Sequence, residues 1–78
     1  MTPKQIIYSD HAERRLRTRR ITRQEVRRLL ATGARTMAPT VSGAQRWQCA
    51  GKLGYDDAAV IFIEDATTIL VVTVMWAK

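Results

Sequence analysis

The stretch SDHAERRLRTRRITRQEVRRLL, residues 9–30, contains the signals of two consecutive helices joined by a very short connection. Ser9 or Asp10 can cap the first helix, since both residue types accept hydrogen bonds from free backbone amides at a helix start. Glu13 lies three residues after Asp10, which is the spacing of a capping box. We expect this helix to run from about residue 11 to residue 19.

The second helix is marked at both ends. Thr22 and Glu25 have the spacing of a capping box, and Ile21 and Val26 are placed to form a hydrophobic staple around it. Gly33 is a natural stop for the helix. Both helices are basic and carry few apolar residues, so neither is expected to be stable without a larger layer to pack on.

After Gly33 the pattern changes to that of strands and turns. Pro39 places its strand at an edge or a bulge, and Ser42 with Gly43 indicates a turn. Short connections favour antiparallel pairing. The sequence predicts a single α+β domain over residues 1–78, in which two N-terminal helices pack on one face of an antiparallel sheet of about four to five strands. The expected strands cover residues 5–8, 35–41, 45–53, 58–63 and 69–76.

Composition narrows the range of functions. The 78 residues carry 13 Lys and Arg against 7 Asp and Glu, a net charge of +6 that favours a polyanion or an acidic protein as partner. One histidine and one cysteine exclude a multi-cysteine zinc site, so we expect no metal and no cofactor. Cys49 lies in an alternating stretch and is expected in the core. Without a signal peptide or a bilayer-long apolar run, we expect a soluble, cytoplasmic protein with no membrane partner.

Eight of the fifteen residues from 14 to 28 are arginine, and the single histidine precedes them. On a helix, His11, Arg15 and Arg19 fall on one stripe, and Arg14 flanks it. Arginine binds phosphate bidentately, and histidine transfers protons near neutral pH. Metal-free RNA cleavage needs such a proton-transfer group beside cations that stabilise the phosphorane. The stripe is therefore a candidate catalytic site with His11 as base or acid.

Other interpretations stay open at this point. His11 could be an ordinary surface residue, and the arginines could pair with acidic side chains, either of a partner protein or at Asp10, Asp56 and Asp57. Arg46 and Lys52 share a strand face and could add RNA-phosphate contacts, or they could be ordinary surface charges.

Aromatic residues are equally ambiguous. Tyr8 is expected to be a half-buried packing residue, although it could also stack on a base. Of Trp47 and Trp76, we expect one in the core and one exposed.

The stretch of residues 9–30 resembles the opening of the family known as domain of unknown function 4258. Its members begin with a strand and a helix carrying His-Ala, and an Ile-Ser/Thr step leads into a second helix. Members commonly carry Gly before that Ile. Arg20 stands there instead, which disfavours a left-handed residue at the junction. The later strands, including residues 71–74, are also similar. The matching residues of the first half are His11, Ala12, Arg15, Leu16, Arg19, Ile21 and Thr22, with Glu25, Val26 and Leu30 following.

The resemblance implies a small α+β fold similar to RelE and ParE toxins and to BrnT. It further implies a toxin-like, metal-independent RNA endonuclease of a toxin–antitoxin system, with RNA as substrate and an acidic antitoxin as partner. Because related folds lack this chemistry, two alternatives are kept: a non-catalytic basic module that docks on an acidic protein, DNA or RNA, and a ParE-like inhibitor that binds an enzyme.

Overall fold

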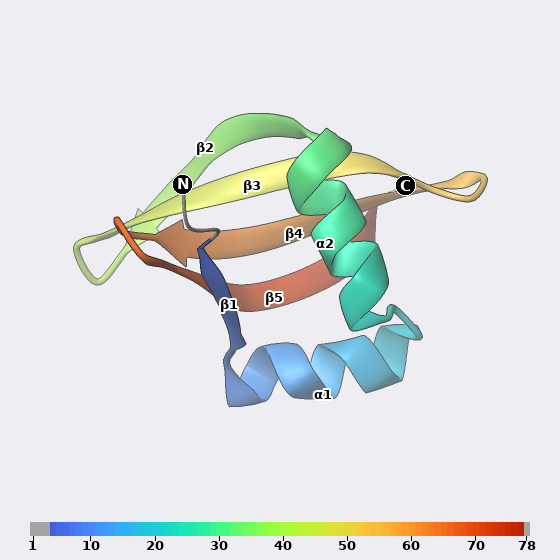
Figure 1. Cartoon of the computed structure of the whole chain (residues 1–78), viewed down its shortest axis with the longest axis horizontal. Coiled ribbons are helices and arrows are strands. Elements are labelled where there is room, and N and C mark those ends of the chain that lie inside the picture. Colours follow the sequence, from blue (N-terminus) through green and yellow to red (C-terminus); the bar gives the residue numbers. More distant parts are fainter. Residues whose placement is uncertain (1–3, 78) are drawn as a thin grey trace.

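The computed structural model describes residues 4–77 and shows an α+β fold of two helices and one five-stranded sheet (Figure 1). The strand order in the sheet is β1-β5-β4-β3-β2. The elements, in chain order, are β1 (Gln5–Tyr8), α1 (Asp10–Arg19), α2 (Arg23–Thr32), β2 (Ala34–Val41), β3 (Ala44–Leu53), β4 (Asp56–Glu64) and β5 (Thr68–Ala77).

The sheet is mixed, and the prediction of a purely antiparallel sheet is therefore wrong. The strands from β2 to β5 form the expected antiparallel meander. In contrast, β1 pairs in parallel with β5, with Gln5 opposite Thr68 and Tyr8 opposite Val71. The two helices reverse the chain between β1 and the meander, so connection length alone does not fix the direction of β1.

Both helices lie on the same side of the sheet, and we call the side they cover the inner face. Helix α2 crosses β3 and β4, whereas α1 lies along β5 at the edge of the sheet, beyond the end of β1 (Figure 1). From α1, Ala12 and Leu16 are buried against this face, and from α2, Val26 and Leu29 are. The strands supply Cys49, Ala58, Val60, Phe62, Val71 and Val74, none more than 2% exposed.

The opposite side of the sheet, called the outer face here, is covered by no helix or strand of residues 4–77. Alternation along the strands places half-buried aliphatic side chains there, among them Ile61 and Ile63 of β4 and Leu70 of β5. Ile7 of β1 lies beside Leu70 and is 42% exposed. The fold therefore has two layers, with one apolar sheet surface open.

The helix ends match the sequence in part. Thr22 and Glu25 form the predicted capping box. At the start of α1, Ser9 is the cap and accepts a hydrogen bond from the Ala12 amide at 3.1 Å. The expectation for Arg20 is wrong, because Arg20 adopts the left-handed conformation with φ 57° and ends α1. Its N–H donates to carbonyls of the last helical turn, which offsets the strain of that conformation.

Gly33 and Pro39 explain how the chain passes from α2 into the sheet. A Cβ at Gly33 would lie 2.7 Å from the carbonyl oxygens of Ala50 and Leu29, so only glycine fits between α2 and β3. Pro39 lies on the edge strand β2, where the register with β3 shifts between Ala38 and Val41. The prediction of an edge or a bulge is therefore confirmed, and both occur in β2.

Candidate nucleic-acid interface

His11 and Arg15 meet on the exposed surface of α1. The Arg15 Nε–H donates a hydrogen bond to His11 Nε2 at 3.4 Å, as the spacing of four residues allows. His11 is exposed and Arg15 is half-buried. The pair is a weak, solvent-accessible contact between a possible base and a cation.

Arg19 continues the stripe at the last turn of α1. Its backbone carbonyl accepts a hydrogen bond from Trp76 Nε1 at 2.8 Å, which ties the end of the helix to β5. The side chain is exposed, and within residues 4–77 no hydrogen bond or ion pair holds its guanidinium. Trp76 thus anchors the backbone while the charge is free to meet an anion.

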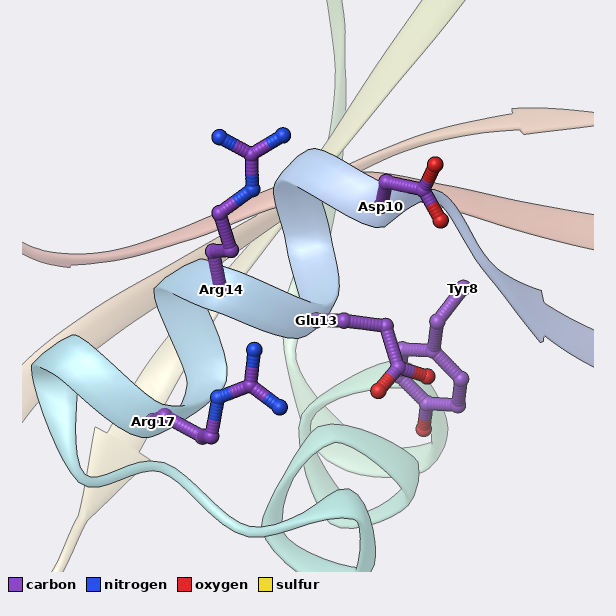
Figure 2. Close-up of a pocket in the computed structure, with 5 residues that line it drawn as sticks. All are labelled: Tyr8, Asp10, Glu13, Arg14 and Arg17. Carbon is purple, nitrogen blue, oxygen red and sulfur yellow. The ribbon is translucent and has the colours of Figure 1, made fainter.

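The opposite flank of α1 has a different character (Figure 2). An open depression of about 430 Å³ is lined there by Tyr8, Asp10, Glu13, Arg14 and Arg17. Glu13 forms an ion pair with Arg23 of α2, and this guanidinium also stacks on the Tyr8 ring with 5.0 Å to its centroid. Burial raises the pKa of the Tyr8 hydroxyl, against the smaller opposing effect of Arg27 and Arg23. This flank faces α2, so the stripe of His11, Arg15 and Arg19 is turned the other way.

Arg14 lies at this depression, where Figure 2 shows its guanidinium pointing away from Glu13 and Tyr8. Sequence reasoning did not single out Glu13 and Arg17 as neighbours of a depression. Their spacing of four residues was the available signal, but it does not reveal which element lies opposite.

Most of the arginine block is free of intramolecular ion pairs. Of the eight arginines in residues 14–28, only Arg23 forms an ion pair within residues 4–77. Within residues 4–77, no arginine of the stripe forms an ion pair with Asp10, Asp56 or Asp57. Asp57 instead binds Lys52, Nζ to Oδ1, at 3.0 Å. Unneutralised guanidinium groups on two adjacent helices make a surface that attracts polyanions.

Arg46 and Lys52 both lie on the outer face, as the alternation of β3 predicts. They are far apart along the strand, since Arg46 is opposite Ala38 of β2 and Lys52 is opposite Asp57 of β4. Lys52 is exposed and paired. Arg46 is half-buried, and its Nε is out of solvent with no hydrogen-bond partner in residues 4–77. No contact in the described chain joins either residue to the stripe.

Cys49 is a core residue, as predicted. It is 2% exposed and its Sγ donates to the Leu29 carbonyl at 2.9 Å. Burial raises the pKa of the Cys49 thiol, which disfavours the nucleophilic thiolate.

The tryptophan prediction is wrong, because Trp47 and Trp76 are both half-buried and both pack against the core. Each lies on the inner face near an end of its strand, where helix cover stops. Within residues 4–77, no three His, Cys, Asp or Glu side chains are grouped as metal ligands.

None of the helices in the described residues is long and apolar enough to cross a bilayer. No curated protein and no solved structure matches the chain. The sequence pattern of one family, however, matches residues 8–76, which include both helices and nearly the whole sheet. The chain therefore belongs to the family described as a domain of unknown function (DUF4258).

Proposed function

We propose that this protein is a RelE-like, toxin-type RNA endonuclease that works without a metal and is held in check by an acidic protein partner. The observation that supports this proposal is the contact of His11 with Arg15 on an exposed flank whose arginines have no ion pairs within residues 4–77. It brings a proton-transfer group and a phosphate-binding cation to one place on a rigid helix. Arg19 extends the same flank and adds a second cation.

In the proposed reaction, His11 takes the proton from the ribose 2′-hydroxyl, and the 2′-oxygen attacks the adjacent phosphorus. The bond to the 5′-oxygen breaks, leaving a 2′,3′-cyclic phosphate and a 5′-hydroxyl end. The imidazolium formed at His11, or water, returns a proton to the departing 5′-oxygen. Arg15 and Arg19 stabilise the additional negative charge on the phosphorane. DNA is not a substrate, because it lacks the 2′-hydroxyl.

The contact between Arg15 and His11 also suggests how the base is released. Nε2 of His11 is occupied by the Arg15 hydrogen bond in the free protein. A phosphate is a stronger acceptor for a guanidinium than a neutral imidazole is, because that hydrogen bond is charge-assisted. RNA binding would therefore draw Arg15 away and free the His11 lone pair beside the 2′-hydroxyl.

A second candidate is a basic module that binds RNA or an enzyme without cutting RNA, as a ParE-like inhibitor would. One observation favours it: His11 is exposed, and the depression of Figure 2 lies on the opposite flank of α1. A site without enclosing walls excludes water poorly, which weakens electrostatic catalysis.

The test incubates purified protein with total RNA in the presence of chelator. Three proteins are compared: the wild type, His11→Ala, and Arg28→Ala, which truncates an exposed side chain of α2 outside the stripe of His11, Arg15 and Arg19 and serves as the control. We expect His11→Ala to lower the cleavage rate by about 10²- to 10⁴-fold. Arg28→Ala should keep most of the activity. Equal cleavage by the wild type and His11→Ala would remove the assignment of His11.

The binding alternative is tested on the same samples. If the wild type yields no cleavage product while its RNA affinity falls steeply with salt, the protein is a binding module. For an enzyme inhibitor, toxicity on expression should persist in the His11→Ala variant. For the proposed nuclease, toxicity and cleavage should be lost together.

A further inference from the structure

The outer face of the sheet carries more apolar side chains along β4 and β5 than is usual for a solvent-exposed sheet surface. Strands β4 and β5 contain the continuous apolar runs AAVIFI, residues 58–63, and ILVV, residues 69–72. Such runs are typical of strands buried on both faces, whereas strands with one solvated face alternate apolar and polar residues. Here only the inner face is covered within residues 4–77. The pattern indicates that a further layer covers the outer face.

The apolar side chains on this face form a continuous row. Ile63 of β4 is opposite Leu70 of β5, which in turn is opposite Ile7 of β1. Ile7 is 42% exposed, which is high for an isoleucine in a strand. The next rungs add Ile61 opposite Thr73 and Ala59 opposite Met75. We call the row of Ile7, Ile63 and Leu70 the aliphatic row.

Nucleic acid is a poor fit for this surface. Single-stranded RNA binds open sheets by stacking its bases on aromatic side chains. The strand register places Trp47, Phe62 and Trp76 on the inner face instead. Around the aliphatic row, the outer face offers aliphatic and small side chains, which pack against other aliphatic side chains. Its occupant is therefore a protein.

Arg46 indicates the charge of that protein. Arg46 precedes Trp47, and Ile63 follows Phe62, the partner of Trp47. Extending this antiparallel register by one residue brings Arg46 toward Ile63, at the end of the aliphatic row. Its Nε is out of solvent and has no hydrogen-bond partner in residues 4–77. A buried guanidinium nitrogen is stabilised by a carboxylate, which forms a charge-assisted hydrogen bond with it.

A second copy of the chain is a less suitable occupant. Each chain carries a net charge of +6, so two copies repel each other. The flank of α1 with His11, Arg15 and Arg19 is turned away from α2 and carries further positive charge. The surplus of positive charge on the chain favours an occupant with acidic residues.

We propose that the outer face docks a protein segment with aliphatic side chains on one side, which pack on the aliphatic row, and carboxylates that bind Arg46. The segment's identification with the inhibitory partner rests on the proposed function, whereas the docking surface does not. Bound there, acidic residues near the α1 flank would compete with RNA phosphates for Arg15 and Arg19.

The experiment selects binders from a random peptide library displayed on phage, with the full wild-type chain as bait. The selected peptides are then titrated against four folded proteins. Two variants alter the outer face, Ile7→Asp and Arg46→Gln. Met37→Asp places the same new charge at a 68% exposed position outside this face and is the matched control. Circular dichroism and thermal unfolding confirm that each variant is folded.

We expect the selected peptides to be rich in Asp, Glu and aliphatic residues. Ile7→Asp and Arg46→Gln should each weaken their binding by about tenfold or more, whereas Met37→Asp should leave it unchanged. Peptides that bind the outer-face variants as tightly as the wild type would overturn the proposal. So would a wild-type dimer in sedimentation that Ile7→Asp dissociates, because the face would then belong to a second copy.

The RNA assay separates this proposal from the proposed function. Ile7→Asp should cleave RNA at the wild-type rate, because Ile7 is outside the His11 flank. A selected peptide should inhibit cleavage by the wild type but not by Ile7→Asp. If the wild type does not cut RNA, the nuclease proposal fails while the peptide titrations still decide the docking surface.

Discussion

The two faces of the sheet are built from similar residues and yet have different environments. Along β4, Val60 and Phe62 on the inner face are 0% and 2% exposed, whereas Ile61 between them is half-buried on the outer face. Hydrophobicity alone does not distinguish these neighbours. The difference arises because α1 and α2 cover one side only. An apolar strand therefore indicates how much surface can be buried, and the packing of other elements decides which surface is buried.

The largest expected effect comes from truncating one residue on each face of β4. Phe62→Ala removes a fully buried ring and should lower the free energy of unfolding by about 3–5 kcal/mol. Ile61→Ala, one position away, should lower it by about 1 kcal/mol, because its side chain is already partly in water. Urea unfolding of both variants measures the difference. Equal losses would show that the outer face is covered in the isolated protein.

A smaller effect is expected at the junction that directs both helices onto the inner face. Arg20 is left-handed, which costs a non-glycine residue about 1–2 kcal/mol. Arg20→Gly removes that strain but adds freedom to the unfolded chain, so we expect a net stabilisation of about 0.5–1 kcal/mol.

Arg19→Gly is the matched control for Arg20→Gly, because it removes the same charge from the last helical residue of α1. It should destabilise the protein by about 1 kcal/mol. Thermal unfolding distinguishes the stabilisation expected for Arg20→Gly from the destabilisation expected for Arg19→Gly. A lower melting temperature for Arg20→Gly would mean that contacts of the Arg20 side chain stabilise the junction.

The smallest effect concerns the part of the inner face that no helix covers. The Arg35 guanidinium lies over Phe62 and Trp47, with 4.9 and 5.0 Å to the ring centroids, and is ion-paired with Glu64. Hydrogen bonds from Lys4 and Arg35 lower the pKa of the Glu64 carboxyl. The pKa of Glu64 is lower in the folded state than in the unfolded state. Its charge therefore stabilises the fold fully above the ordinary pKa of about 4.3, and this stabilisation is lost as the pH falls through the folded-state pKa.

The difference in unfolding free energy between the wild type and Glu64→Gln should therefore be largest near neutral pH. It should shrink as the pH falls below about 4.3. Asp56→Asn, at an exposed position without an ion pair in residues 4–77, is the control. A difference that does not change between pH 7 and acid would show that Glu64 acts through packing and not through its charge.

Local signals predicted local structure well. Three predictions depended only on neighbouring residues, and the structure confirms all three. They are the capping box of Thr22 and Glu25, the burial of Cys49 and the edge position of Pro39. The parallel pairing of β1 could not be predicted in this way, because its partner strand lies 63 residues away along the chain. The conformation of Arg20 was missed because tertiary packing of two helices overrides the preference of one residue.

For the candidate site, helical spacing predicted the contact between His11 and Arg15, which the structure shows. Alternation in β3 likewise placed Arg46 and Lys52 on one strand face. The sequence did not show that Lys52 is paired with Asp57 or that Arg46 Nε is hidden from solvent. Both facts depend on which side chains lie across the strand or over it, and no pattern within one segment contains that information.

The pairing of β1 with β5 also sets an order of events during synthesis of the chain. Residues of β1 and α1 leave the ribosome before those of β5, the strand on which both dock. The hydroxyl of Ser9 donates to the Val72 carbonyl, 63 residues later, and Trp76 holds the far end of the same helix. A chain whose synthesis stops before β5 lacks the strand on which α1 packs. The fold that positions His11 therefore forms only after β5 has been translated.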